Sequence, residues 1–128
     1  MGLDNGICVK RNYHTTNIQE LQPFEDSWDK QHTHDFEICY WRKCWNIRNA
    51  ILWAIEREFD IQYEFKLTST DIGNIIIILM SYKEDNWEDS IWEFEEIEEQ
   101  LKQDVKNLQL LQDLMEKHNL EVYFYDSY

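Results

Sequence analysis

The residues best suited to bind a charged ligand gather around positions 42–48, where basic side chains directly follow an apolar stretch. N–H groups at the start of a helix attract anions, and a helix is expected to begin here, so a phosphate could be held at this junction. No glycine-rich loop accompanies it. The candidate set for a nucleotide or another anion is Asp4, Asn5, Arg42, Lys43, Asn46 and Arg48.

Arg48 also has a structural interpretation. At 100° per residue it falls on the apolar face of the expected helix, close to the positive end of the helix dipole. A buried guanidinium in that place needs a carboxylate or an anionic ligand. Asp4, Asp35 and Glu37 are the candidate carboxylates. An internal ion pair is favoured over a ligand clamp, because buried charges are usually satisfied within the protein.

Thiol and imidazole groups supply the other reactive side chains. Cys39 and Cys44 lie five positions apart across the junction, which is not a zinc-site spacing, and His32 and His34 precede them. We expect core thiols and solvated histidines. No nucleophile, metal set or cofactor loop stands out, so the sequence predicts no catalytic residue, no metal and no cofactor, and an enzyme is the least favoured reading.

A second candidate surface is acidic. Residues 84–99 hold nine acidic side chains and no basic one. The dipole of a helix favours acidic residues in its first turn, but it does not account for nine charges over four turns. We therefore expect a binding face for a basic partner, with a solvated helix start as the alternative. This acidic face comprises Glu84, Asp85, Glu88, Asp89, Trp92, Glu93, Glu95, Glu96 and Glu99, and Trp92 could serve as an aromatic anchor.

Composition limits the partners. Twelve basic against 26 acidic residues give a net charge of −14, which argues against direct binding of nucleic acid or an anionic membrane. A basic host protein, including one that itself binds nucleic acid, is the expected partner. Three cysteines form no even disulfide framework and predict a reducing cytoplasm. The apolar run at 75–80 is too short to span a membrane. Oligomeric state is left open.

Periodicity predicts the elements that position these residues. Residues 3–10, 35–43, 61–67 and 120–125 alternate as strands do, and Gly6 in the first is expected at a bulge or a close backbone approach. Residues 35–43 are apolar on both faces, which predicts a central strand. The strand at 61–67 is expected to be exposed or to lie at an edge. Residues 11–34 show no period and read as one long loop.

Helical spacing predicts three helices. The first begins at Cys44 and extends toward Phe59; the second follows a capping box at Thr68 and Asp71; the third is long, from about residue 90 to about 118. The fold class is therefore α+β, with a small, mainly antiparallel sheet of three to four strands packed by about three helices. Residues 1–128 form a single domain.

The strings MGLDNGI, YWRKCWNIRNAI and VYFYDSY at the opening, centre and end resemble a group of small proteins from phages and prophages of Gram-positive bacteria. The resemblance implies a phage accessory role in the cytoplasm of the bacterial host and names no site residue. Small acidic phage proteins include inhibitors of host defence such as anti-CRISPR proteins, which are similar in size and charge. A non-enzymatic binding or inhibitory protein is the expectation, and a small-ligand sponge is the alternative.

Overall fold

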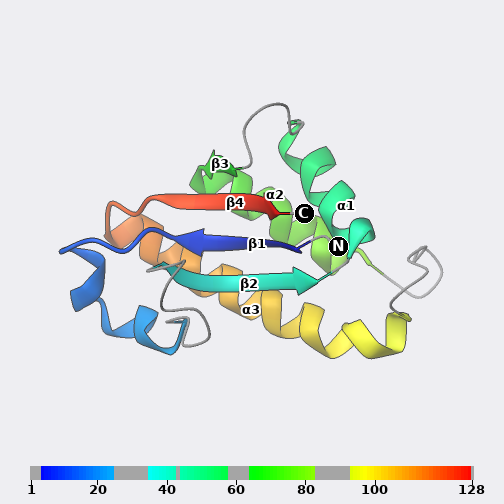
Figure 1. The fold of residues 1–128 in the computed structure, drawn as a ribbon, viewed down its shortest axis with the longest axis horizontal. Helices are drawn as coiled ribbons and strands as arrows, with labels where there is room; N and C mark the ends of the chain where they lie inside the picture. Colours follow the sequence, from blue (N-terminus) through cyan, green and yellow to red (C-terminus); the bar gives the residue numbers. More distant parts are fainter. Residues whose placement is uncertain (1–3, 25–34, 43, 58–63, 83–92, 128) are drawn as a thin grey trace.

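The computed structural model describes residues 4–24, 35–42, 44–57, 64–82 and 93–127, and they form an α+β fold. A four-stranded antiparallel sheet lies in front of α2 and α3 in Figure 1, and α1 packs beside α2. The elements are β1 (Asp4–Val9), η1 (Thr15–Asn17), η2 (Gln19–Phe24), β2 (Phe36–Arg42), α1 (Trp45–Ile55), β3 (Glu64–Leu67), α2 (Ser69–Met80), α3 (Phe94–Lys117) and β4 (Val122–Ser127).

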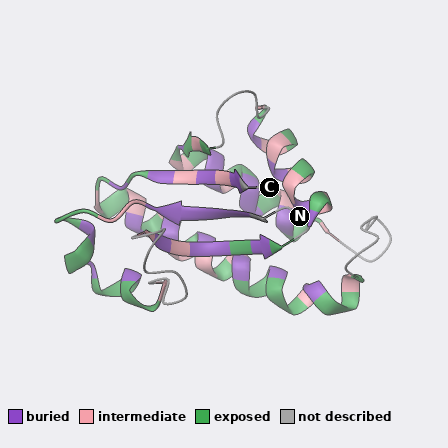
Figure 2. Ribbon diagram, in the orientation of Figure 1, coloured by how far each residue is buried: buried purple, intermediate pink, exposed green. Residues whose placement is uncertain are grey.

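The first and last strands of the chain lie side by side in the middle of the sheet. The strand order is β2-β1-β4-β3, so β1 pairs with both β2 and β4, each time antiparallel. Ile7 stands opposite Cys39 on one side and Phe124 on the other. Residues Asn5 to Val9 are all buried, which Figure 2 shows as a continuous run of purple along β1.

The prediction that residues 35–43 form a central strand is wrong, because β2 lies at an edge of the sheet. Its apolar residues of both parities have another cause: a register shift places Phe36, Cys39 and Trp41 on the same helix-facing side, and α3 also runs along the strand. The side-chain amide of Gln100 donates to the Tyr40 carbonyl at 2.9 Å, and that of Asn107 donates to the Ile38 carbonyl at 3.4 Å. A helix that covers the edge buries residues that an uncovered edge strand would expose.

The other edge strand, β3, was predicted to be exposed or to lie at an edge, and the structure confirms this. Its described residues begin at Glu64, so the start expected at residue 61 lies outside the described part of the chain. Arg57 Nη1 donates to the carbonyl of Lys66 at 2.7 Å. Backbone carbonyls of both edge strands therefore accept hydrogen bonds from side chains outside the sheet.

Helix α1 follows β2 almost immediately, as the change of period predicts. Ile47, Ile51 and Ile55 form its buried stripe. The helix ends at Ile55, before the expected Phe59, because Glu56 adopts a left-handed conformation with φ 56°. Its N–H donates to the carbonyls of the last turn, which closes the helix there.

Helix α2 confirms the predicted capping box. Asp71 N–H donates to Thr68 Oγ1 at 3.1 Å, and Thr68 N–H donates to Asp71 Oδ2 at 2.9 Å. The isoleucine-rich stretch that follows is helical, with Ile72 and Ile75 in the core. Local capping and 3.6-residue spacing prevail here over the strand preference of isoleucine.

Helix α3 is the longest described helix, as predicted, and His118 terminates it. Its expected start near residue 90 lies outside the described residues. The predicted long loop at 11–34 contains η1 and η2 in its described part, residues 11–24. Ile18 and Leu21 enter the core from this segment. Two apolar residues three apart are too short a pattern to reveal helical turns in sequence.

The side chain of Tyr125, from β4, crosses β1 at Gly6 and reaches Glu37 of β2. The Tyr125 hydroxyl donates to the Glu37 carboxylate, with its ring close to the backbone of Gly6. A Cβ at Gly6 would overlap the carbonyl oxygen of Cys39 and lie 2.8 Å from the Tyr125 hydroxyl oxygen. The expected close approach is confirmed, and the register of β1 on β2 shifts one residue later, between Ile7 and Cys8.

Replacing Gly6 with alanine should destabilise the fold by about 1–3 kcal/mol, the usual cost of overpacking a rigid site. Gly73→Ala is the matched control. A Cβ there meets only the side-chain amide of Gln112, at 3.1 Å, and alanine favours the helix by about 0.5–1 kcal/mol. Urea unfolding of both variants measures the difference. Equal stability of the two variants would contradict this account of the Tyr125 crossing.

Candidate functional site

A row of polar side chains crosses the helix-facing side of the sheet at one end. Asn5 of β1 stands opposite Trp41 of β2 and Asp126 of β4. Residues directly opposite in an antiparallel pair share a face, so the three side chains lie in line, and we call them the polar row. The next two rows along the sheet are apolar. The polar row therefore concentrates buried hydrogen-bonding groups at the end of the sheet where α1 begins.

Arg48 of α1 binds one end of the polar row. Its Nη2 lies 3.0 Å and its Nε 3.1 Å from Oδ2 of Asp126. The Asp126 side chain is 1% exposed and that of Arg48 14%. The guanidinium also lies 5.3 Å from the ring of Trp45. Arg48 thus points to the inner side of α1, as its helical position predicts, and forms an internal ion pair.

The partner of Arg48 comes from a strand that sequence reasoning did not consider. Of the three candidate carboxylates, Asp35 pairs with Lys10, and Glu37 accepts from the Tyr125 hydroxyl. The side chain of Asp4 lies outside the described residues. The signal for Asp126 was its polar character within an aromatic strand, but only the strand order brings it beneath α1.

Asn5 lies at the centre of the polar row with no hydrogen bond to its side chain. Its Nδ2 and Oδ1 both lack a partner, as does Oδ1 of Asp126, and Asn5 has no exposed surface. A buried polar group left unsatisfied costs about 1–3 kcal/mol. Since Asn5 is completely inaccessible to solvent, a ligand could reach it only if the surrounding elements moved.

Asn46, another residue of the candidate ligand set, takes part in a different contact. The single proton of the Tyr82 hydroxyl is shared between two acceptors of Asn46, Oδ1 at 2.6 Å and the carbonyl at 2.9 Å, which ties α1 to the end of α2. Arg42 is exposed at the end of β2, and Lys43 lies outside the described residues. Asn5 and Arg48 are therefore brought together, whereas Asn46 joins a separate contact between two helices.

Asp104 of α3 binds the other end of the polar row. Its Oδ2 accepts from the indole Nε1 of Trp41 at 2.8 Å. Burial raises the pKa of the Asp104 carboxyl to about 6, although hydrogen bonds from Trp41, Gln100 and Cys39 lower it. At one end of the polar row Asp126 therefore lies beside a cation, and at the other end Trp41 donates to Asp104, an acid among neutral donors.

The three cysteines are buried and form no disulfide. Burial, with Asp35 nearby, raises the pKa of the Cys8 thiol to about 12, and burial raises the pKa of Cys39 well above its usual value. Neither thiol ionises near neutral pH, so neither is an activated nucleophile. Within the described ranges no group of three or more His, Cys, Asp or Glu could hold a metal ion.

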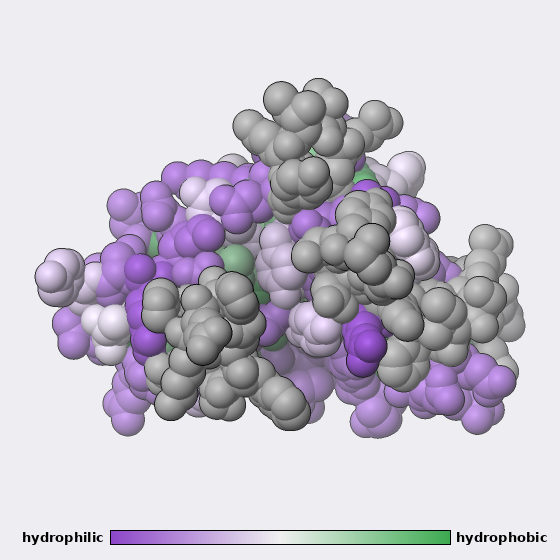
Figure 3. Space-filling model, in the orientation of Figure 1, coloured by the Kyte–Doolittle hydropathy of each residue, from purple (hydrophilic) through white to green (hydrophobic). Residues whose placement is uncertain are grey.

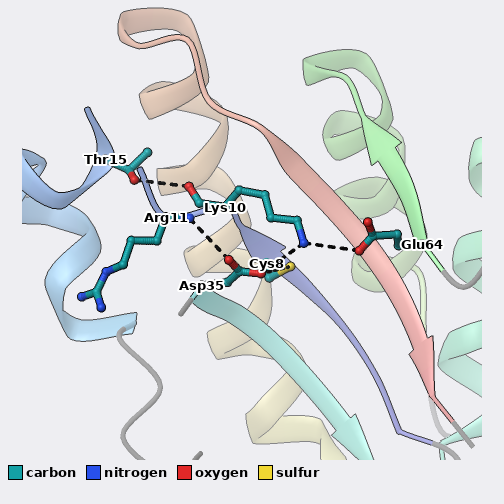
Figure 4. A network of polar contacts seen from close by, with 6 residues as sticks. All are labelled: Cys8, Lys10, Arg11, Thr15, Asp35 and Glu64. Carbon is teal, nitrogen blue, oxygen red and sulfur yellow. Dashed lines mark hydrogen bonds and ion pairs between the residues drawn. The ribbon is translucent and has the colours of Figure 1, made fainter. Parts of the chain in front are cut away.

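A second polar network lies on the opposite face of the sheet (Figure 4). Lys10, at the end of β1, lies 3.3 Å from Asp35 and 3.4 Å from Glu64 of β3. The ammonium also lies 5.0 Å from the ring of Tyr123, so it spans β4 to join β1 and β3. Asp35 accepts from the Arg11 N–H at 3.4 Å. Sequence reasoning missed this network, whose members come from four separate segments.

The surface in front of the sheet is mostly hydrophilic, with a small apolar area near its centre (Figure 3). On the first turns of α3, Glu93, Glu95, Glu96 and Glu99 are exposed and Glu98 is half-buried. Lys102 lies 3.6 Å from Glu98 and 3.2 Å from Glu99. The other predicted members of the acidic face, Glu84, Asp85, Glu88, Asp89 and Trp92, lie outside the described residues.

No family model, curated protein or solved structure matches the chain. Among the described residues, no helix is both long enough and apolar enough to cross a membrane. The assignment of function therefore depends on the site geometry and on the sequence.

Removing the guanidinium of Arg48 should destabilise the folded protein. Arg48→Met leaves the buried Asp126 carboxylate without its ion-pair partner, which should lower the free energy of unfolding by about 3–5 kcal/mol and the melting temperature by several degrees. Arg48→Glu should destabilise the protein more than Arg48→Met, since it places a second carboxylate beside that of Asp126. Lys102→Met, which removes exposed ion pairs that solvent screens, should leave stability almost unchanged. An Arg48→Met protein as stable as the wild type would indicate a ligand-binding role instead.

Asp104 should make stability depend on pH. The pKa of the Asp104 carboxyl is raised from 3.8 to about 6 in the folded protein, so protonation of this group favours folding. Its contribution to the free energy of unfolding is greatest below about pH 4 and is lost as the pH rises through about 6. Asp104→Asn keeps an acceptor for Trp41 and removes this titration. Its stability relative to wild type should increase by about 2–3 kcal/mol between pH 4 and pH 7, at 1.36 kcal/mol per pKa unit.

The control for this prediction is Asp113→Asn, which changes an exposed acid of the same helix. Thermal or urea unfolding across the pH range measures both variants. A stability difference between Asp104→Asn and wild type that stays constant with pH would show that the Asp104 carboxyl keeps its ordinary pKa.

Proposed function

We propose that the protein is a phage or prophage accessory protein of the bacterial cytoplasm that binds a basic host protein, without catalysing a reaction, through the acidic face at the start of α3. The supporting observation is the exposure of Glu93, Glu95, Glu96 and Glu99 on the first turns of this helix. A host-defence protein that binds nucleic acid is the favoured class of partner, since such proteins carry basic surfaces.

The start of α3 needs only some of these charges. Glu93 is the N-cap, and Glu96 Oε2 accepts from the Glu93 N–H at 3.1 Å, so both take part in a capping box. Glu95 and Glu99 are not needed for that cap. Lys102 is the cation that pairs with Glu98 and Glu99, and it leaves an excess of negative charge on these turns. That excess would steer a basic partner toward this end of the molecule.

The interior supports binding rather than catalysis. The polar groups with unusual environments, Asp104, Asp126 and Cys8, are buried and contact the protein's own side chains. Addition of a partner strand is also disfavoured, because side chains of α3 and Arg57 already bind carbonyls of the two edge strands. A partner would therefore bind side chains on the surface.

The alternative is a small-ligand binding protein or sponge that uses the region of Asn5 and Arg48. The observation in its favour is the buried Asn5 amide without hydrogen-bond partners. It requires α1 to move away from the sheet, since Asn5 has no exposed surface. Heat released on titration with nucleotides would support this alternative over the acidic face.

Affinity capture from host lysate tests the proposal. The tagged wild-type chain should retain a basic protein, and retention should fall as ionic strength rises. Glu95→Gln with Glu99→Gln should weaken retention several-fold or more. Asp113→Asn with Glu116→Gln is the matched control, because it removes the same charge from exposed positions near the other end of α3. Equal loss in both double variants, or retention of only acidic or neutral proteins, would contradict the proposal.

A further inference from the structure

The outer side of α1 carries an exposed aromatic stripe. Trp45, Asn49 and Trp53 follow one another at intervals of four residues, so they share one face of the helix. Trp45 is 41% exposed and Trp53 75%, although tryptophan is normally largely buried. Ile47, Ile51 and Ile55 occupy the opposite side, so the stripe is not required to attach α1 to the core.

This stripe carries almost no charge, in a chain whose net charge is −14. Arg48 is the single charged residue between Trp45 and Ile55, and its charge is paired with Asp126, although the guanidinium also contacts the Trp45 ring and Asn49. Just beyond the helix, Glu56 and Arg57 have opposite signs. A surface rich in aromatic residues and poor in charge has the composition of the core of a protein interface. It is also a surface where two strongly acidic chains could meet with little direct repulsion.

The stripe is symmetric about Asn49, and this symmetry indicates the partner. We propose that α1 binds α1 of a second copy of this chain, antiparallel, about a two-fold axis that passes near Asn49. In that arrangement Trp45 of each copy lies against Trp53 of the other, and the two Asn49 side chains meet at the axis. An interface of this kind uses the same patch on both copies, which a palindromic stripe provides.

Asn49 has the chemistry that the axis requires. Its Oδ1 accepts from Arg48 Nη1 at 3.3 Å, and its amide nitrogen is a donor that can bond across the axis. A polar residue at the centre of an apolar helix interface fixes the register of the two helices. A hollow of about 680 Å³ beside Trp53, lined by Asn49, Leu52 and Arg57 among others, can receive the indole ring of the opposing Trp45.

The dimer would present two acidic faces, although it does not depend on the function proposed for them. Because each copy carries the same net charge, long-range repulsion opposes association and salt screens it. Dimerisation should therefore strengthen as ionic strength rises. This is the reverse of the salt dependence expected for capture of a basic partner, so the two proposals can fail independently.

Sedimentation velocity over a range of protein concentrations tests the dimer. Wild type should change from monomer to dimer, at lower concentration in higher salt. Trp53→Ser should raise the dissociation constant tenfold or more, because it removes an indole ring from each half of the interface. Tyr13→Ser is the control, because Tyr13 is 96% exposed and lies before η1, outside the stripe. Circular dichroism confirms that each variant is folded.

Cross-linking tests the position of the axis. Asn49→Cys should form a disulfide-linked dimer in oxidised glutathione, and Glu116→Cys, exposed on α3, should not. The native cysteines are buried and should not contribute. A wild-type chain that stays monomeric at all concentrations, or equal cross-linking of the two cysteine variants, would overturn the proposal. So would a monomeric chain whose tryptophans become protected only when a different protein binds.

Discussion

The pairing of β1 with β4 is the interaction on which the rest of the structure depends. It joins the two ends of the chain in the middle of the sheet, and β4 supplies a partner to each polar network: Asp126 to Arg48, Tyr125 to Glu37, and Tyr123 to Lys10. None of these contacts can form before the last strand is in place. Contacts between distant segments carry a large entropic cost before they stabilise the chain, so we expect the final docking of β4 to make folding cooperative.

The buried groups of the polar row, which are unfavourable to remove from water, position the helices on the sheet. Trp41 donates to Asp104 of α3 and Asp126 accepts from Arg48 of α1, so the two ends of the row specify where each helix packs on the sheet. Asn5, between them, has no such partner. Replacing a buried ion pair by apolar residues is often neutral for stability, whereas breaking one is not. We therefore interpret Arg48 and Asp126 as residues that fix the position of α1.

Sequence reasoning found what local rules determine and missed what the sheet order determines. The capping box at Thr68, the isoleucine stripe of α1 and the inward position of Arg48 depend on neighbouring residues, and all appear in the structure. The edge position of β2 and the pairing with Asp126 depend on which strands are neighbours, and periodicity contains no such information. For the acidic face, the structure describes only the part from Glu93 onward.

A double-mutant cycle on Arg48 and Asp126 tests the central claim most directly, that their contact is structural. Arg48→Met and Asp126→Leu are made singly and together, and the free energy of unfolding is measured for all four proteins. Each single change breaks the ion pair and keeps one of its two charged groups, whereas the double variant leaves an apolar pair. The account predicts that the double variant is more stable than either single variant, with a coupling energy of roughly 3 kcal/mol. Additive losses, with the double variant the least stable, would contradict it.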